Sequence, residues 1–195
     1  ALAIGNPSTG QTMNLARRRF FMLLATGSIA GWSLLGAGCS TDAGDDGSQP
    51  DGSSPVLLNE LLASNDAVLA DESGEFDDWL ELYNQTDSEV DLSGWLLSGG
   101  PVSAQEPFAL PAGTSIAAAG YLVVWADDDP EQGALHADFK LARIGETLAL
   151  YDPSGDVADS VTFPEQQTDV SWARQPDGSG DWQALTNPSP GLSNE

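Results

Sequence analysis

Basic residues are scarce in this chain of 195 residues. Six Lys and Arg side chains stand against 30 Asp and Glu, and the formal net charge is −24. Nucleic acids attract proteins mainly through basic surfaces, so this charge excludes nucleic acid as an electrostatic partner. Direct attraction to an anionic membrane surface is excluded for the same reason.

Cysteine and histidine are almost absent. The chain has one Cys, Cys39, and one His, His136. One Cys cannot form an internal disulfide, and single copies of Cys and His cannot build the multi-cysteine or multi-histidine zinc centres of common hydrolases. The composition therefore predicts that any bound metal has oxygen ligands.

Acidic residues are missing from the first 38 positions, where three arginines precede an apolar run over 20–37. A positive segment followed by an apolar one is typical of a signal peptide. Ala37 and Gly38 then precede Cys39, an ending that resembles a bacterial lipoprotein signal. The resemblance implies that Cys39 is lipidated and becomes the mature N-terminus, with Ser40 favouring the outer membrane in a Gram-negative cell.

The start of this segment leaves two export routes open. Arg17, Arg18, Phe20 and Phe21 also resemble the twin-arginine export motif, beside the general secretory signal. Met13 suits an initiator, with residues 1–12 as an upstream extension. An uncleaved anchor is the alternative, since about 18 apolar residues can just span a bilayer. Both the lipoprotein signal and the uncleaved anchor place the rest of the chain outside the cytoplasm, and the lipoprotein signal predicts an exported, membrane-anchored protein on the outer membrane or cell surface.

The composition divides the chain into three parts. Residues 1–38 are the extension and signal, and 39–55 hold the lipidated Cys and a polar, acidic linker. A linker with so few apolar residues cannot offset its conformational entropy, so we expect disorder there. Residues 56–195 are the right length for one domain.

Short apolar runs recur in the domain about every ten residues, which is typical of an all-β sandwich of about nine strands. The predicted strands are 56–62, 79–83, 92–97, 114–116, 121–125, 139–141, 147–151, 157–163 and 170–174. Alternation places Leu148 and Leu150 on the buried face of one strand, and Val157, Val161 and Phe163 on that of the next.

The five tryptophans of residues 56–195 fall into two groups by position. Trp79, Trp95 and Trp125 lie in predicted strands and are expected in the core. Trp172 and Trp182 lie near the turn-rich C-terminus and are better candidates for exposed stacking.

A series of short motifs spans nearly all of residues 56–195. In chain order they are LNE at 58–60, DWLELYN at 78–84, VDLSGW at 90–95, LPAGT at 110–114, GYLVVW at 120–125, GETLAL at 145–150 and PSPG at 188–191. Together they resemble the bacterial form of the lamin-tail domain. The resemblance implies an immunoglobulin-like β-sandwich that serves as an interaction or structural module, often appended to hydrolases.

Catalytic patterns are weak. No Gly-x-Ser-x-Gly elbow occurs, and no base or nucleophile lies at a spacing from His136 that would indicate a catalytic site. We therefore predict no enzymatic activity and no catalytic residues.

Calcium binding is a more specific hypothesis than catalysis, because eight acidic residues and no Lys or Arg lie between positions 59 and 81. Hard cations take six to eight oxygen ligands, although the spacing here is not that of an EF-hand. The residues expected to bind calcium are Glu60, Asp71, Asp78 and Glu81. The alternative is that Glu60 and Glu81 accept hydrogen bonds from loop N–H groups.

The sequence thus predicts a non-catalytic, lipid-anchored module of the cell envelope that binds an unknown protein or polysaccharide. The alternatives are an accessory domain beside a secreted hydrolase, or a small calcium-dependent hydrolase.

Overall fold

A computed structural model describes residues 54–99 and 106–194 of the chain. The predicted signal peptide, the twin-arginine motif, Cys39 and nearly all of the linker lie outside these residues. All twelve regular elements of the described part are β-strands. No helix there is long and apolar enough to cross a membrane.

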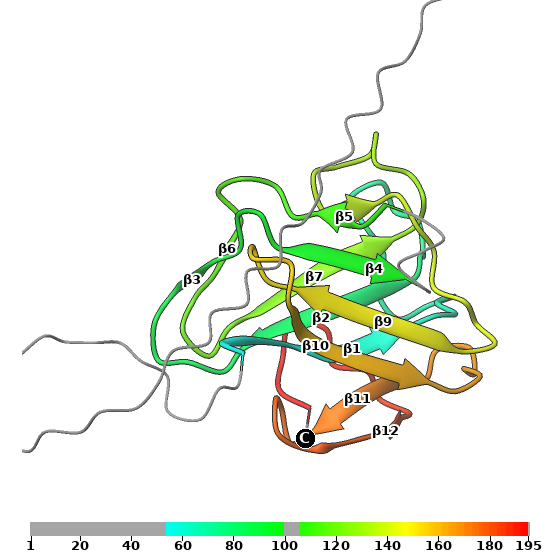
Figure 1. The fold of residues 1–195 in the computed structure, drawn as a ribbon. Helices are drawn as coiled ribbons and strands as arrows, with labels where there is room; N and C mark the ends of the chain where they lie inside the picture. The colour runs from blue at the N-terminus through cyan, green and yellow to red at the C-terminus, as the bar shows by residue number, and fades with distance from the viewer. Residues whose placement is uncertain (1–53, 100–105, 195) are drawn as a thin grey trace, which may run out of the picture. The chain divides into compact units, whose positions relative to one another are not determined.

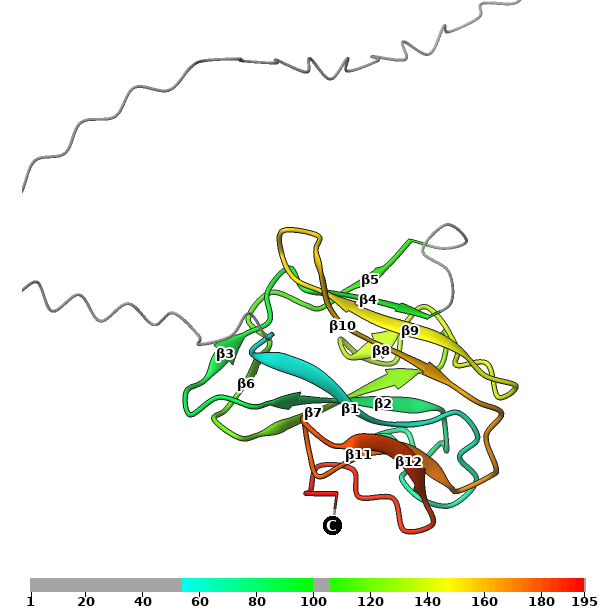
Figure 2. The ribbon, with the colours of Figure 1, turned by 60° about the horizontal axis from the view of Figure 1, so that its bottom comes forward.

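The strands form a two-layered sandwich, visible from the side in Figure 2. In spatial order the larger sheet contains β12 (Asp181–Leu185), β11 (Ser171–Gln175), β1 (Val56–Leu62), β2 (Trp79–Asn84), β7 (Tyr121–Ala126) and β8 (His136–Ala137). The facing sheet contains β10 (Val157–Phe163), β9 (Glu146–Tyr151), β4 (Leu96–Gly99) and β5 (Phe108–Ala109). A ribbon of β3 (Val90–Asp91) and β6 (Ser115–Ile116) lies at one end (Figure 1). The all-β, immunoglobulin-like prediction is confirmed.

The core lies between the two sheets and draws on both. Leu80 and Val124 enter it from the larger sheet, and Leu97 and Leu148 from the facing sheet. A second, smaller cluster of Leu62, Trp79 and Trp125 lies under Val68 and Leu69 of the β1–β2 loop. Strand β2 is therefore buried along most of its length, with only Tyr83 partly exposed.

Two predicted strands differ from the observed ones because burial does not require a strand. The run over 92–97 begins as a turn, in which Gly94 has a φ of 81° and the Trp95 N–H donates to the Leu92 carbonyl at 3.0 Å. The prediction for 139–141 is wrong. Phe139 and Leu141 are buried, but the strand in this region is β8. The nine-strand count also missed β3, β5 and β12.

Strand β10 contains a bulge that reverses one predicted side chain. Its pairing with β9 shifts between Val157 and Asp159. Val161 and Phe163 are buried as expected, whereas Val157 is 60% exposed. The alternation is therefore correct after the bulge and wrong before it.

The predicted core tryptophans are confirmed, since Trp79, Trp95 and Trp125 are 0%, 5% and 8% exposed. The expectation of exposed stacking at Trp172 and Trp182 is wrong. Both are half-buried against the core, and the Arg174 guanidinium lies 5.0 Å from the ring centroid of Trp182.

Replacing Trp95 by Ala should lower the free energy of unfolding by about 3–5 kcal/mol, because it removes a buried indole and leaves a cavity. Val157→Ala is the matched control, and its exposed position predicts a change within about 0.5 kcal/mol. Urea denaturation followed by circular dichroism measures both. Equal midpoints for Trp95→Ala and the wild type would contradict the placement of Trp95 in the core.

Candidate functional site

Strand β1 carries a bulge that turns two neighbouring polar residues the same way. Its pairing with β2 shifts between Leu58 and Glu60, after which Glu60 stands opposite Glu81. Leu58 and Leu61 both enter the core. Asn59 and Glu60 both contact the C-terminal segment instead. The bulge thus places an amide and two carboxylates under that segment.

Both carboxylates are buried and accept hydrogen bonds from the end of the chain. Glu81 is 0% exposed, and its Oε2 accepts the Gly191 N–H at 2.5 Å. Glu60 is 1% exposed, and its Oε1 accepts the Ser171 hydroxyl at 2.5 Å and the Ser189 N–H at 3.2 Å. Like charges directly opposite each other destabilise a sheet unless such partners compensate.

Asp177 and Asn194 complete this group, which we call the Asn59 network (Asn59, Glu60, Glu81, Asp177 and Asn194). The Asn59 amide donates to Glu81 at 3.1 Å and to Asp177 at 2.9 Å. Asp177 also accepts the Tyr121 hydroxyl at 2.8 Å and the Asn194 N–H at 3.1 Å. The network therefore links β1, β2, β7 and the last residues of the chain.

Burial and hydrogen bonding shift the pKa values of these acids in opposite directions. Burial raises the pKa of Glu60, and it raises the pKa of Glu81 to about 7 despite the bonds from Gly191 and Asn59. For Asp177, burial is opposed by several donors, among them Asn59 and Tyr121, and the net effect lowers its pKa. Asp177 is the member of the network that holds its negative charge most readily.

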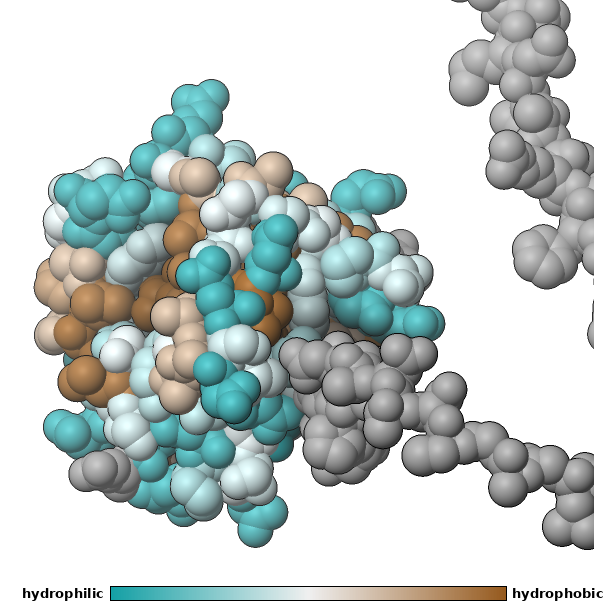
Figure 3. Space-filling view, turned by 90° about the vertical axis from the view of Figure 1, so that its left-hand side faces the viewer, coloured by the Kyte–Doolittle hydropathy of each residue, from teal (hydrophilic) through white to brown (hydrophobic). Residues whose placement is uncertain are grey.

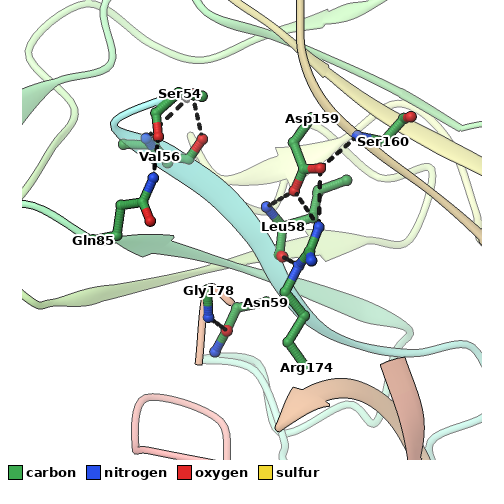
Figure 4. Close-up of polar contacts among 9 residues, drawn as sticks. All are labelled: Ser54, Val56, Leu58, Asn59, Gln85, Asp159, Ser160, Arg174 and Gly178. Atoms are coloured by element: carbon green, nitrogen blue, oxygen red, sulfur yellow. Dashed lines mark hydrogen bonds and ion pairs between the residues drawn. The ribbon is translucent and has the colours of Figure 1, made fainter. Parts of the chain in front are cut away.

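A salt bridge next to the network joins the two sheets, as Figure 4 shows. Arg174 of β11 donates to both carboxylate oxygens of Asp159 in β10, at 3.0 and 3.1 Å. The Leu58 N–H donates to Asp159, and Arg174 Nε donates to the Leu58 carbonyl. The backbone of β1 just before its bulge is thus held from both layers.

A second group, the His136 cluster (Asp71, Glu72, Asp127 and His136), lies at the β8 end of the larger sheet. Parallel pairing places His136 opposite Trp125, and the two rings stack at 6.1 Å. His136 is 1% exposed, and its Nδ1 forms a short hydrogen bond with Asp127 Oδ2. The imidazole is therefore fixed on one side by an aromatic ring and at one nitrogen by a buried carboxylate.

The β1–β2 loop brings two acids to the other side of the imidazole. Glu72 Oε1 lies 3.2 Å from His136 Nε2, but the geometry is not that of a hydrogen bond. Asp71 Oδ1 accepts the N–H groups of Ser73 and Glu75, and its Oδ2 has no partner. Burial acts to lower the pKa of His136, but Asp127 and Glu72 outweigh it and raise that pKa.

The four residues predicted to bind calcium are not brought together. Glu60 and Glu81 belong to the Asn59 network, and Asp71 belongs to the His136 cluster. Among the described residues, Asp71 also groups with Glu75 and Asp77 as three carboxylates that are close enough for one ion. Asp78 lies in neither set, and burial raises its pKa to about 7.

Sequence reasoning missed the pairing of Asp127 with His136. The eight positions between them include the turn before β8, so no local periodicity relates the two side chains. The one available signal was a lone His flanked by Leu135 and Ala137, since a buried imidazole needs a polar partner.

A surface pocket of about 510 Å³ lies where β1 begins. It is lined by Ser54, Pro55, Trp95, Asp152, Pro153, Asp156, Val157 and Ala158. Figure 3 views the molecule from the β3–β6 end and shows apolar residues in small areas among hydrophilic ones. Trp95 is only 5% exposed, so it cannot offer a full ring face to a sugar.

The family model of the lamin tail domain matches residues 49–165. No curated protein matches the chain. The matched range includes Asn59, Glu60, Glu81 and the whole His136 cluster, whereas Asp177 and Asn194 follow it.

Replacing Glu81 by Gln should flatten the pH dependence of stability. The folded state keeps a proton on Glu81 that the unfolded chain releases between its ordinary pKa of 4.5 and about 7. Stability should therefore fall as pH rises through this window, by roughly 3 kcal/mol for this group. Urea denaturation of the wild type and Glu81→Gln at pH 5 and pH 8 measures the difference.

The matched control is Glu89→Gln, because Glu89 is an exposed carboxylate of the same size. It should retain the pH dependence of the wild type. An unchanged pH dependence in Glu81→Gln would contradict the raised pKa of Glu81.

Proposed function

Because the chain belongs to the lamin tail domain family, we propose that it acts as a non-catalytic binding or structural module, anchored to the cell envelope by a lipid on Cys39. The module would be exported, and its partner would be an envelope protein or a polysaccharide. The hydrogen bonds that the buried carboxylates accept within the fold support the non-catalytic part of this proposal. The sequence around Cys39 supports the lipid anchor.

The buried carboxylates of the Asn59 network are hydrogen-bonded within the fold itself. Glu60, Glu81 and Asp177 accept hydrogen bonds from N–H and O–H groups of the same chain. A general acid or base must instead reach the proton of a substrate. The two ring nitrogens of His136 both face carboxylates, Asp127 and Glu72, rather than a hydroxyl or thiol. These arrangements support a structural role for the buried acids.

The charge after Cys39 supports a module held away from the membrane surface. Lys140, Arg143 and Arg174 are the basic residues in that part of the chain, against all 30 acids. Such a domain is repelled by anionic lipid, so the lipid would act as a tether rather than the start of a membrane-bound surface. The 15 residue-to-residue steps from Cys39 to Ser54 can span at most about 50 Å when extended.

The pocket beside β1 favours a second candidate function, an accessory domain that binds the substrate of a secreted hydrolase. Its lining combines apolar Pro55 and Pro153 with the carboxylates Asp152 and Asp156. Apolar walls with a few polar groups are usual for small-ligand sites.

Replacing Cys39 by Ala should leave an unprocessed precursor, because the thiol is the acceptor of the lipid. Mass spectrometry of membrane fractions should find the wild-type N-terminus at Cys39 with acyl chains attached. Ser40→Ala is the control, and it should still be processed and lipidated. A wild-type N-terminus at another residue, or an unmodified Cys39, would contradict the lipid anchor.

The purified chain should not turn over ester, glycoside or phosphodiester substrates, with or without calcium. A steady-state assay against these classes tests this, with His136→Ala as the variant that removes the one imidazole. Turnover that disappears in His136→Ala would contradict the non-catalytic proposal and would identify the His136 cluster as an active site. Capture of a polysaccharide without its cleavage would instead favour the accessory-domain candidate.

A further inference from the structure

The His136 cluster contains two buried polar atoms that make no hydrogen bond within the fold. His136 Nε2 has no hydrogen-bond partner, although the side chain is 1% exposed. Asp71 Oδ2 is also unpartnered, on a residue that is 9% exposed. An unsatisfied buried polar atom is costly, and such atoms are rare in folded proteins. Two of them in one cluster point to a ligand that pairs with both.

The donor atoms are close enough to share one ion. One ligand atom each from Asp71, Glu72 and His136 lies within 4.8 Å of the other two. Tetrahedral zinc, with bonds of 2.0–2.2 Å, places neighbouring donors about 3.4 Å apart. The separation of His136 Nε2 and Glu72 Oε1 is 3.2 Å, close to that spacing.

Asp127 prepares the imidazole for metal binding. When Nδ1–H of a neutral imidazole donates to Asp127, the lone pair is left on Nε2, which faces Glu72. A carboxylate that orients the other ring nitrogen is the usual outer-shell arrangement of a metal-binding His. Without a metal ion, a proton on Nε2 faces Glu72 at 3.2 Å, so the metal ion would take the place of that proton.

The backbone also leaves room for the two ligands to meet. A Cβ built on Gly133 would lie 2.8 Å from His136 Cδ2 and 2.9 Å from Glu72 Oε1. Any larger residue would therefore crowd the imidazole and the carboxylate.

From this geometry we propose that Asp71, Glu72 and His136 bind a first-row divalent transition metal ion, with zinc as the reference ion. Two carboxylates and a neutral imidazole carry the charge that balances a dication. A nitrogen donor suits zinc and its neighbours, whereas calcium and magnesium prefer oxygen. The ion would join the β1–β2 loop to the start of β8. This site shares only Asp71 with the calcium residues predicted from the sequence, and it does not depend on the lipid anchor.

The test uses the full chain in a Cys39→Ala background, so that no thiolate competes for the ion. Isothermal titration with zinc should give one ion per chain. Cobalt(II) should give the intense visible absorption of a tetrahedral site. Equal concentrations of calcium or magnesium should not displace the cobalt.

Glu72→Gln is the decisive variant, because its side chain is 62% exposed and its loss should not unfold the domain. It should weaken zinc binding at least tenfold. Asp127→Asn should weaken it about 10- to 100-fold by releasing the imidazole from its fixed orientation. Glu131→Gln is the matched surface control and should bind zinc like the parent chain. Glu75→Gln should also retain zinc, because Glu75 belongs to the all-oxygen group.

Three outcomes would overturn the proposal. The first is no zinc binding by the parent chain, which would identify His136 as an imidazolium between two carboxylates. The second is zinc binding that Glu72→Gln leaves unchanged, which would place the ion elsewhere on the acidic surface. The third is stronger binding of calcium than of zinc together with its loss in Glu75→Gln, which would assign the ion to Asp71, Glu75 and Asp77.

Discussion

The bulge in β1 is the constraint on which the rest of the larger sheet depends. One additional residue lets Leu58 and Leu61 both enter the core while Asn59 and Glu60 both face the C-terminal segment. Just before the bulge, the Leu58 backbone is held by Asp159 of one layer and Arg174 of the other. A regular strand could not meet both demands, because its side chains alternate strictly between the two faces. The bulge therefore joins the packing of the sandwich to the polar contacts beneath the end of the chain.

Burying Glu60 and Glu81 costs desolvation energy, and the C-terminal segment offsets part of that cost. The donors from Ser189 and Gly191 reach these acids only because the chain returns over the strands after β12. The match to the lamin tail domain ends at residue 165, before these donors. Residues 171–194 are thus integral to the fold, since without them two carboxylates of β1 and β2 would be buried with fewer partners.

Patterns of neighbouring residues in the sequence predicted the features that depend on neighbouring residues alone. Short apolar runs located β1, β7 and β10, and the position of Trp79, Trp95 and Trp125 in such runs identified them as core residues. The pattern failed where contacts between distant segments decide the outcome. Val157 is turned outward by a bulge, and Phe139 is buried without belonging to a strand. Strand β12 is mostly exposed and half polar at the sheet edge, so it has no apolar signal to detect.

The predicted acidic site shows the same limit, because crowding of acids in sequence does not fix their partners in space. Glu60 and Glu81 stand opposite each other and find donors from 110 to 129 residues away. Asp71 and Glu72 instead approach His136 across the sheet, where Asp71 Oδ2 and His136 Nε2 remain unpartnered. The chain therefore compensates one pair of buried acids with its own N–H and O–H groups. Around His136, the Ser73 and Glu75 N–H groups reach only Oδ1 of Asp71, and the imidazole faces Asp127 and Glu72, so a positive charge at Nε2, from a proton or from the proposed metal ion, compensates these acids.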